Sequence, residues 1–112
     1  MHSMLKHALF ASVLLSSSAV IATPFGDADK GKHKSPSCIY CHGATGISNN
    51  DSYPHLAGQN AKYLYDSMKA YKDGLRRGPL ADMMAAQLRM LNDDDLRDVA
   101  AFYAQQSPQA KD

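Results

Sequence analysis

The sequence predicts an all-α fold of three to four helices joined by long loops. Two observations support this prediction. Hydrophobic side chains recur at helical spacing in the second half of the chain, and no stretch of useful length alternates as a strand would. The chain has 112 residues, which is enough for one small domain.

The N-terminal segment has the pattern of a secretory signal peptide. Lys6 precedes an apolar run, and Val20 and Ala22 fit the small residues of a cleavage site. We therefore expect residues 1–22 to be removed, which leaves a mature domain of residues 23–112 in the periplasm. The alternative is a retained membrane anchor. The apolar run is interrupted by serines and is shorter than the roughly 20 residues that a span requires, so no stable membrane span is expected after cleavage.

Proline and glycine residues mark the expected limits of the helices before the last one. A short helix is expected from about Asp27 to His33, and Pro36 limits its extent. The next is expected within residues 60–74, which carry one apolar face and end at a glycine. Pro79 suits the first turn of a third helix. Residues 38–59 are rich in Gly, Asn, Ser and Pro, and are expected to form a loop.

The last helix is the most completely specified element. Asn92 is a candidate N-cap, and the three Asp residues that follow it suit the positive end of the helix dipole. Leu91 and Leu96 occupy the two positions of a hydrophobic staple. The expected buried stripe consists of Leu96, Val99, Ala100 and Tyr103, with Phe102 at its edge.

Charge and size restrict the possible functions. Beyond Lys6, 11 Lys and Arg residues balance 11 Asp, and there is no Glu. The sequence therefore has no basic stripe for nucleic acid and no acidic tail. The whole chain has no Trp and three Phe, so a mature chain this short builds a thin core. Domains of this size often depend on a metal, a disulfide or another cross-link.

The segment "CIYCH" contains the only two cysteines of the chain, Cys38 and Cys41. A thioredoxin-like redox pair is expected beside a βαβ pattern, which is missing from the sequence. A zinc site needs about four ligands, but His33 and His55 are isolated in the sequence. A structural disulfide is possible in an exported protein, although so short a loop gains little stability from one.

Covalent haem attachment is the interpretation that the motif favours. In Cys-x-x-Cys-His the two thiols add to the haem vinyl groups, and the imidazole of His42 then lies under the iron as an axial ligand. The export signal and the absence of other cysteines agree with this interpretation. A haem would also supply the large apolar body that the thin core lacks.

These features together resemble the class I c-type cytochromes, and most of all the small bacterial single-haem type that also forms each half of the dihaem members. The resemblance runs from Gly26 to Gln105. It is carried, in order, by "GDADKGK", "CIYCHGATG", "YPHLAGQNAKYL", "MKAYKDGLR", a Met-bearing segment and "LNDDDLRDVAAFYA". It implies a cytochrome c fold wrapped around one haem c per chain, with six-coordinate iron, in a protein that carries electrons.

The resemblance also implies that a methionine is the second axial ligand. In similar cytochromes this Met lies seven residues before the Leu that precedes the capped last helix. That Leu is Leu91 here, which indicates Met84, with Met83 as the alternative if the count slips by one. Met68 and Met90 are expected to pack. A thioether ligand favours ferrous iron and closes the coordination sphere.

Further haem contacts follow from the resemblance. The carbonyl of Pro54 is expected to accept a hydrogen bond from His42 and so orient its ring. Leu56 is expected to pack on the haem face. Arg76, or Arg77 in its place, is expected near a haem propionate. His55 is expected to be a partly exposed loop residue rather than a ligand.

In this family a small residue seven positions before the first cysteine lets the first helix cross the last. That residue is Gly31, and its expected aromatic partner is Phe102, or else Tyr103. Pro36 departs from the family pattern and is expected to shorten the first helix.

The expected function is one-electron transfer between redox protein partners, without enzymatic activity of its own. Two alternatives remain within haem chemistry. The chain is a haem subunit of a larger oxidoreductase, or its distal site is open and serves gas binding or catalysis. A zinc or thiol–disulfide module without haem is a third.

Overall fold

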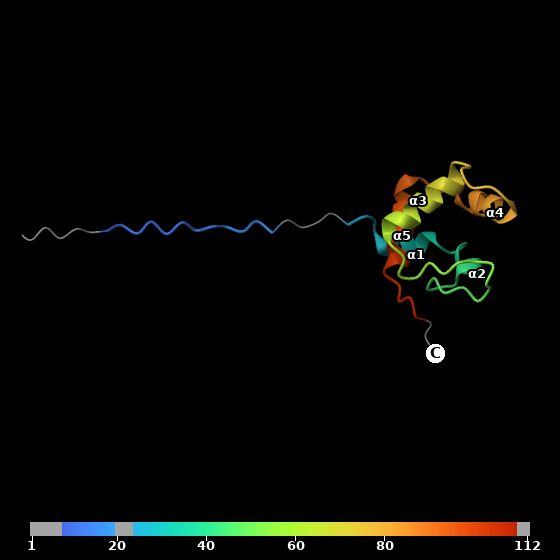
Figure 1. Ribbon diagram of the computed structural model, residues 1–112, viewed down its shortest axis with the longest axis horizontal. Coiled ribbons are helices and arrows are strands. Elements are labelled where there is room, and N and C mark those ends of the chain that lie inside the picture. Colours follow the sequence, from blue (N-terminus) through green and yellow to red (C-terminus); the bar gives the residue numbers. More distant parts are fainter. Residues whose placement is uncertain (1–7, 20–23, 110–112) are drawn as a thin grey trace, which may run out of the picture.

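The computed structural model describes residues 8–19 and 24–109 of the chain. The predicted cleavage site lies at residues 20–23, outside the described residues. Residues 8–19 form neither helix nor strand and extend away from the helical domain in Figure 1. Within the described residues, no helix is both long and apolar enough to cross a membrane.

Residues 24–109 contain five helices and no strands. They are α1 (Ala28–Lys34), α2 (Ile39–His42), α3 (Ala61–Lys72), α4 (Pro79–Leu88) and α5 (Asp93–Ala104). The all-α prediction is confirmed. The difference is α2, a single helical turn within the segment that was expected to be a loop.

The ends of the longer helices follow the predicted local chemistry. Asn92 caps α5 through a bond from the Asp95 amide, and the Asp95 carboxylate in turn accepts from the Asn92 amide, each at 2.9 Å. This reciprocal pair is a capping box, which satisfies two amides that the helix itself cannot. Asn60 caps α3 by accepting from the Tyr63 amide at 3.0 Å, and Pro79 occupies the first turn of α4 as expected.

The core forms where α1 and α3 pack against α5 (Figure 1). Its central cluster comes from α3 and α5 and consists of Leu64, Val99, Ala100, Phe102 and Tyr103. The predicted stripe of α5 is therefore buried. The other long helix, α4, packs against α3 and contributes no residue to this cluster.

Gly31 allows α1 to cross α5 at close range. A Cβ atom at this position would lie 1.9 Å from the Asp98 carbonyl oxygen and 2.9 Å from Cβ of Phe102. The predicted contact between Gly31 and Phe102 is thus present. Pro36 does not disturb it, because α1 ends at Lys34 and the crossing lies earlier in the helix.

A buried carboxylate also joins α1 to α5, which the sequence did not reveal. Asp98 accepts a bond from the Asp27 amide at 2.8 Å and another from the Lys34 ammonium at 2.6 Å. Asp27 caps one end of α1 and Lys34 is its last residue. One side chain of α5 therefore holds both ends of the seven-residue helix.

Candidate haem site

The two thiols and the imidazole of the motif are brought together by α2. Cys38 is the N-cap of this one-turn helix, and the His42 amide donates to the Cys38 carbonyl at 2.9 Å. Gly43 ends the helix with a φ of 82°, where a side chain would be strained. The turn places Cys38, Cys41 and His42 within one short rigid element. The two cysteines are not joined in a disulfide.

His42 is buried and held in one orientation. Its Nδ1 lies 2.9 Å from the Pro54 carbonyl oxygen, which has no hydrogen to donate, so Nδ1 carries the proton. The other ring nitrogen, Nε2, is then unprotonated in the neutral imidazole and is able to bind a metal. The contact that was expected between His42 and Pro54 is present in the structure.

The setting of Cys38 suits a neutral sulfur. The residue is partly buried and packs against the core cluster, as does Leu56. Burial raises the pKa of the Cys38 thiol above its usual value, with Ser37 opposing the shift and Cys41 adding to it. A buried site that disfavours the thiolate accommodates a thioether, which carries no charge. The donor set therefore fits covalently attached haem.

A buried hydroxyl lies beside this site. Tyr103 is 1% exposed, and its hydroxyl has no hydrogen-bond partner among the described residues. Burial raises the pKa of Tyr103 to about 12, and the Cys38 thiol also acts to raise it. The nearby Ser35 hydroxyl opposes that shift, but donates its own hydrogen to the Lys32 carbonyl at 3.0 Å. The phenol therefore stays protonated at neutral pH.

The two candidate methionines lie on different sides of α4. Met84 is half-buried and shares a face with Ala81 and Leu88, both of which are buried. Met83 is 49% exposed. Positions separated by three or four residues share one side of a helix, so Met84 belongs to the inward stripe and Met83 does not.

Arg76 is engaged with an aromatic side chain. Its guanidinium donates to the Tyr71 hydroxyl at 2.9 Å and lies 4.6 Å from the centre of that ring. The bond to Tyr71 raises the pKa of Arg76, so the group stays charged. Arg77 is exposed.

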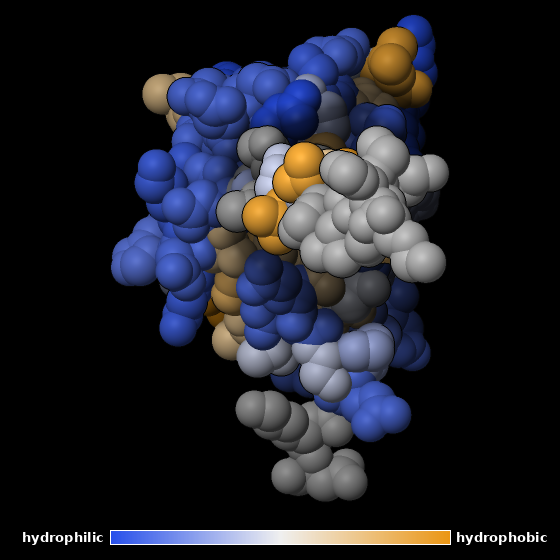
Figure 2. All heavy atoms as spheres, turned by 90° about the vertical axis from the view of Figure 1, so that its left-hand side faces the viewer, coloured by the Kyte–Doolittle hydropathy of each residue, from blue (hydrophilic) through white to orange (hydrophobic). Residues whose placement is uncertain are grey.

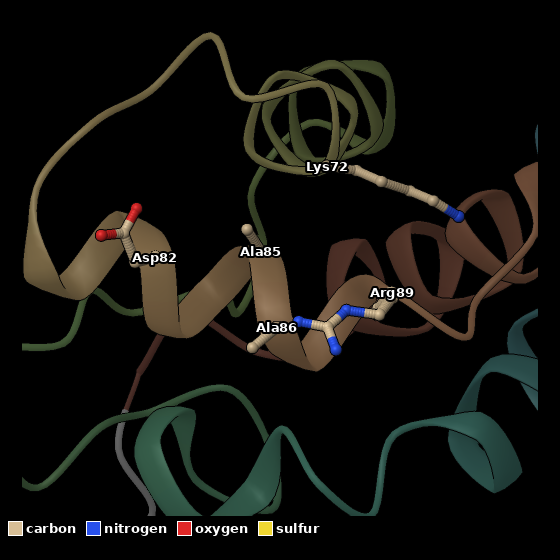
Figure 3. A pocket seen from close by; sticks show the side chains of 5 residues that line it. All are labelled: Lys72, Asp82, Ala85, Ala86 and Arg89. Carbon is tan, nitrogen blue, oxygen red and sulfur yellow. The ribbon is translucent and has the colours of Figure 1, made fainter.

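A hollow of about 300 Å³ between α3 and α4 is separate from this site (Figure 3). Figure 3 shows Lys72 on α3, three of the other side chains on α4, and Arg89 at the C-cap of α4. The lining residues are Lys72, Asp82, Ala85, Ala86 and Arg89, which include none of the candidate haem residues. No group of three or more His, Cys, Asp or Glu within residues 8–19 and 24–109 is arranged to hold a metal ion.

The loop after α2 contains contacts that the sequence reading did not find. The Ser48 amide donates to Nδ1 of His55 at 2.8 Å, and the Ser48 hydroxyl lies 2.8 Å from the Cys41 carbonyl. Ser48 is 8% exposed although it lies in a polar loop. Ser48 and His55 meet because the loop turns back between them, and no local sequence pattern indicates this.

A helical turn with two thiols and an anchored imidazole, set in an all-α domain, is the arrangement of a c-type haem protein. The comparison with known proteins agrees: the cytochrome c family matches residues 28–107, and this chain belongs to that family of electron carriers. Membership implies covalently bound haem c. The domain is a single-haem class I cytochrome that resembles one half of the dihaem cytochrome c4.

Named relatives show how much of each protein is shared. The chain is 44% identical over 81 residues to cytochrome c-554(548) of Halomonas halodenitrificans, covering 72% of this chain and 98% of the relative. It is 40% identical to cytochrome c4 of Pseudomonas aeruginosa, covering 88% of this chain and 48% of the relative. The crystal structure of reduced cytochrome c4 from Pseudomonas stutzeri superposes with a TM-score of 0.65 at 36% identity, covering 73% of this chain and 46% of that one. The chain thus spans about half the length of the c4 proteins.

Proposed function

We propose that this chain is a periplasmic one-electron carrier that holds one haem c. Cys38 and Cys41 attach it covalently, and His42 and Met84 are the axial ligands to its iron. The observation that carries the proposal is the contact between His42 Nδ1 and the Pro54 carbonyl, on the same helical turn as two free thiols. This contact leaves Nε2 free to bind the iron.

The residues have distinct tasks in this proposal. Each thiol would add across one vinyl double bond of the haem to form a thioether, with no atom lost and no oxidant required. The bound haem supplies an iron that alternates between the ferric and ferrous states as one electron enters and leaves. Pro54 would hold the His42 ring in place, Leu56 would pack on the haem face, and Arg76 would lie near a propionate. With His42 and Met84 both kept as ligands, each transfer would involve little reorganisation.

Two features support the location and the partners. The N-terminal residues have the pattern of an export signal, and covalent haem would be attached after export. The thiosulfate dehydrogenase electron acceptor of Stutzerimonas stutzeri is 38% identical over 69 residues, which make up 32% of that relative. Its name supports a dehydrogenase as one donor class for this chain. Hydrophilic side chains are prominent on the face shown in Figure 2, which lies on the opposite side of the domain from α2 (Figure 1).

The test is expression of the full chain with haem-attachment machinery, followed by a pyridine haemochrome assay and mass measurement of the purified protein. We expect a mature chain that begins near Thr23 and carries one haem mass. Replacement of both Cys38 and Cys41 by Ala is expected to abolish covalent attachment. A colourless purified protein of unmodified mass would overturn the proposal.

A further inference from the structure

Three hydrogen bonds and two peptide bonds close a ring around the loop that follows α2. The Ser48 hydroxyl donates to the Cys41 carbonyl at 2.8 Å, and the Ser48 amide donates to His55 Nδ1 at 2.8 Å. His55 directly follows Pro54, whose carbonyl accepts from His42 at 2.9 Å. His42 in turn directly follows Cys41. The ring therefore includes Cys41 and His42, the last two residues of α2.

We propose that His55 is a positioning residue for the axial imidazole. Its Nδ1 fixes the loop at Ser48 and thereby holds the Pro54 carbonyl at the distance that orients His42. This inference rests on the proposed function, because it assigns a role to the contact of the ligand His42. It adds a residue that does not itself touch the iron.

The burial of Ser48 explains why the bond matters. Ser48 is 8% exposed, and its amide donates to the imidazole of the exposed His55 in a part-buried bond. An amide drawn away from water is unfavourable without a partner. The Ser48 hydroxyl at the same time donates to the Cys41 carbonyl and accepts from the Asn50 amide, the latter at 3.1 Å. Loss of the His55 acceptor would therefore move Ser48 or the His55 backbone, and either movement is transmitted to Pro54.

Pro54 needs such support from its neighbours. It has no amide hydrogen with which to anchor itself, and the residue is exposed. On its C-terminal side the Leu56 amide donates to the Gly46 carbonyl at 2.7 Å. The bond at His55 lies between that anchor and Pro54, so it is the nearest restraint on the carbonyl from this side.

The acceptor can be removed or retained by substitution. His55→Leu keeps a branched side chain of moderate size but has no acceptor. His55→Asn places an amide oxygen at the same branch as Nδ1 and can accept the Ser48 amide bond. His33→Leu is the matched control. His33 also bonds the backbone through Nδ1, to the Asp29 carbonyl at 2.7 Å, but it lies exposed on α1.

The experiment compares these three variants with the unaltered holoprotein by midpoint potential and by NMR exchange of two protons. In His55→Leu we expect the Ser48 amide and the His42 Nδ1 proton to exchange about tenfold faster or more, with a shifted midpoint potential. His55→Asn is expected to restore both, and His33→Leu to leave both unchanged.

Unchanged exchange at His42 and an unchanged potential in His55→Leu would overturn the proposal, as would an Asn variant that behaves like the Leu variant. The haemochrome assay on the same samples separates this outcome from failure of the proposed function. Protein without covalent haem contradicts the carrier proposal, whereas loaded protein with an indifferent His55 contradicts only the positioning role.

Discussion

The ammonium of Lys34 lies 2.6 Å from Oδ2 of Asp98, which is buried between α1 and α5. The same ammonium lies 2.7 Å from Oδ1 of Asp95. Because Asp98 also accepts the Asp27 amide, its carboxylate is satisfied on both oxygens. A buried charge is tolerated when it is paired and hydrogen-bonded in this way.

Removing this charge is expected to weaken the domain. Asp98→Asn keeps an acceptor for the Asp27 amide but loses the charged bond to Lys34, and should lower the free energy of unfolding by about 1.5–3 kcal/mol. The control is Asp66→Asn, which breaks an exposed pair with Lys62 and should cost less than about 1 kcal/mol. Denaturant unfolding of both variants measures the difference. Equal losses would show that burial adds nothing to this pair.

The same pair gives stability a defined pH range. Burial acts to raise the pKa of Asp98, but the bonds from Lys34 and the Asp27 amide outweigh it, so the pKa lies below the usual 3.8. Its contribution is therefore present above about pH 3.8 and is lost as pH falls through the lower folded-state value. Bonds to Asp95 and Asp98 raise the pKa of Lys34 above 10.5, so its contribution is full below that pH and is lost above it.

Comparison with a Lys34→Met variant isolates this effect from other titrating groups. The difference in unfolding free energy between the two proteins should be largest between about pH 5 and 9. It should shrink toward both extremes. A difference that stays constant down to the lowest pH at which the protein folds would contradict the assignment.

Gly31→Ala is expected to be destabilising although alanine favours helices. At an open helical position the change would gain about 1 kcal/mol. Here the new Cβ would meet the Asp98 carbonyl, a backbone atom that cannot move aside alone. We expect a net loss of about 1–3 kcal/mol, typical of overpacking, measured by thermal or denaturant unfolding.

Gly74→Ala provides the contrast. No atom lies within 4 Å of a Cβ built there, so its cost comes only from a φ of +72°. That strain is about 1–2 kcal/mol. If Gly31→Ala instead raised stability, the close crossing of α1 and α5 would be incorrect.

The axial methionine is tested by paired substitutions in α4. Met84→Ala is expected to remove the Met–iron charge-transfer band of the ferric protein and to lower the midpoint potential, because a thioether favours ferrous iron. Met83→Ala should leave the spectrum unchanged, since Met83 points away from the inward stripe. The reverse result would assign the ligand to Met83.

Carbon monoxide separates the carrier from a protein with an open distal site. With Met84 bound, the reduced protein should bind carbon monoxide slowly at neutral pH. Met84→Ala should bind it rapidly, because the sixth position is then free. Rapid binding to the unaltered protein would favour the gas-binding alternative.

The local chemistry of the long helices was readable from the sequence. Asn92 and the following Asp residues marked the start of α5, and Gly31 identified the crossing with Phe102. These features depend on neighbours in sequence or on the family pattern. The one-turn helix α2 was missed because four residues carry too little periodic signal, and nucleation of a single turn depends on tertiary contacts.

The buried polar contacts were less accessible to sequence reasoning. Asp98 lies on α5 among apolar residues, which indicates that its carboxylate is buried and paired. Its partners Asp27 and Lys34 are identified only by the crossing of α1 and α5. Ser48 and His55 meet because the loop turns back between them. Such contacts depend on the path of the whole chain, which no local pattern specifies.

The elements that pack against Cys38 are synthesised after it. The cluster against which this thiol packs is built from α3 and α5, the latter near the end of the sequence. A chain that emerges N-terminus first therefore presents both thiols long before α5 can close over Cys38. Under the proposed function, we therefore expect haem to reach the Cys38 thiol most easily before α5 packs against it.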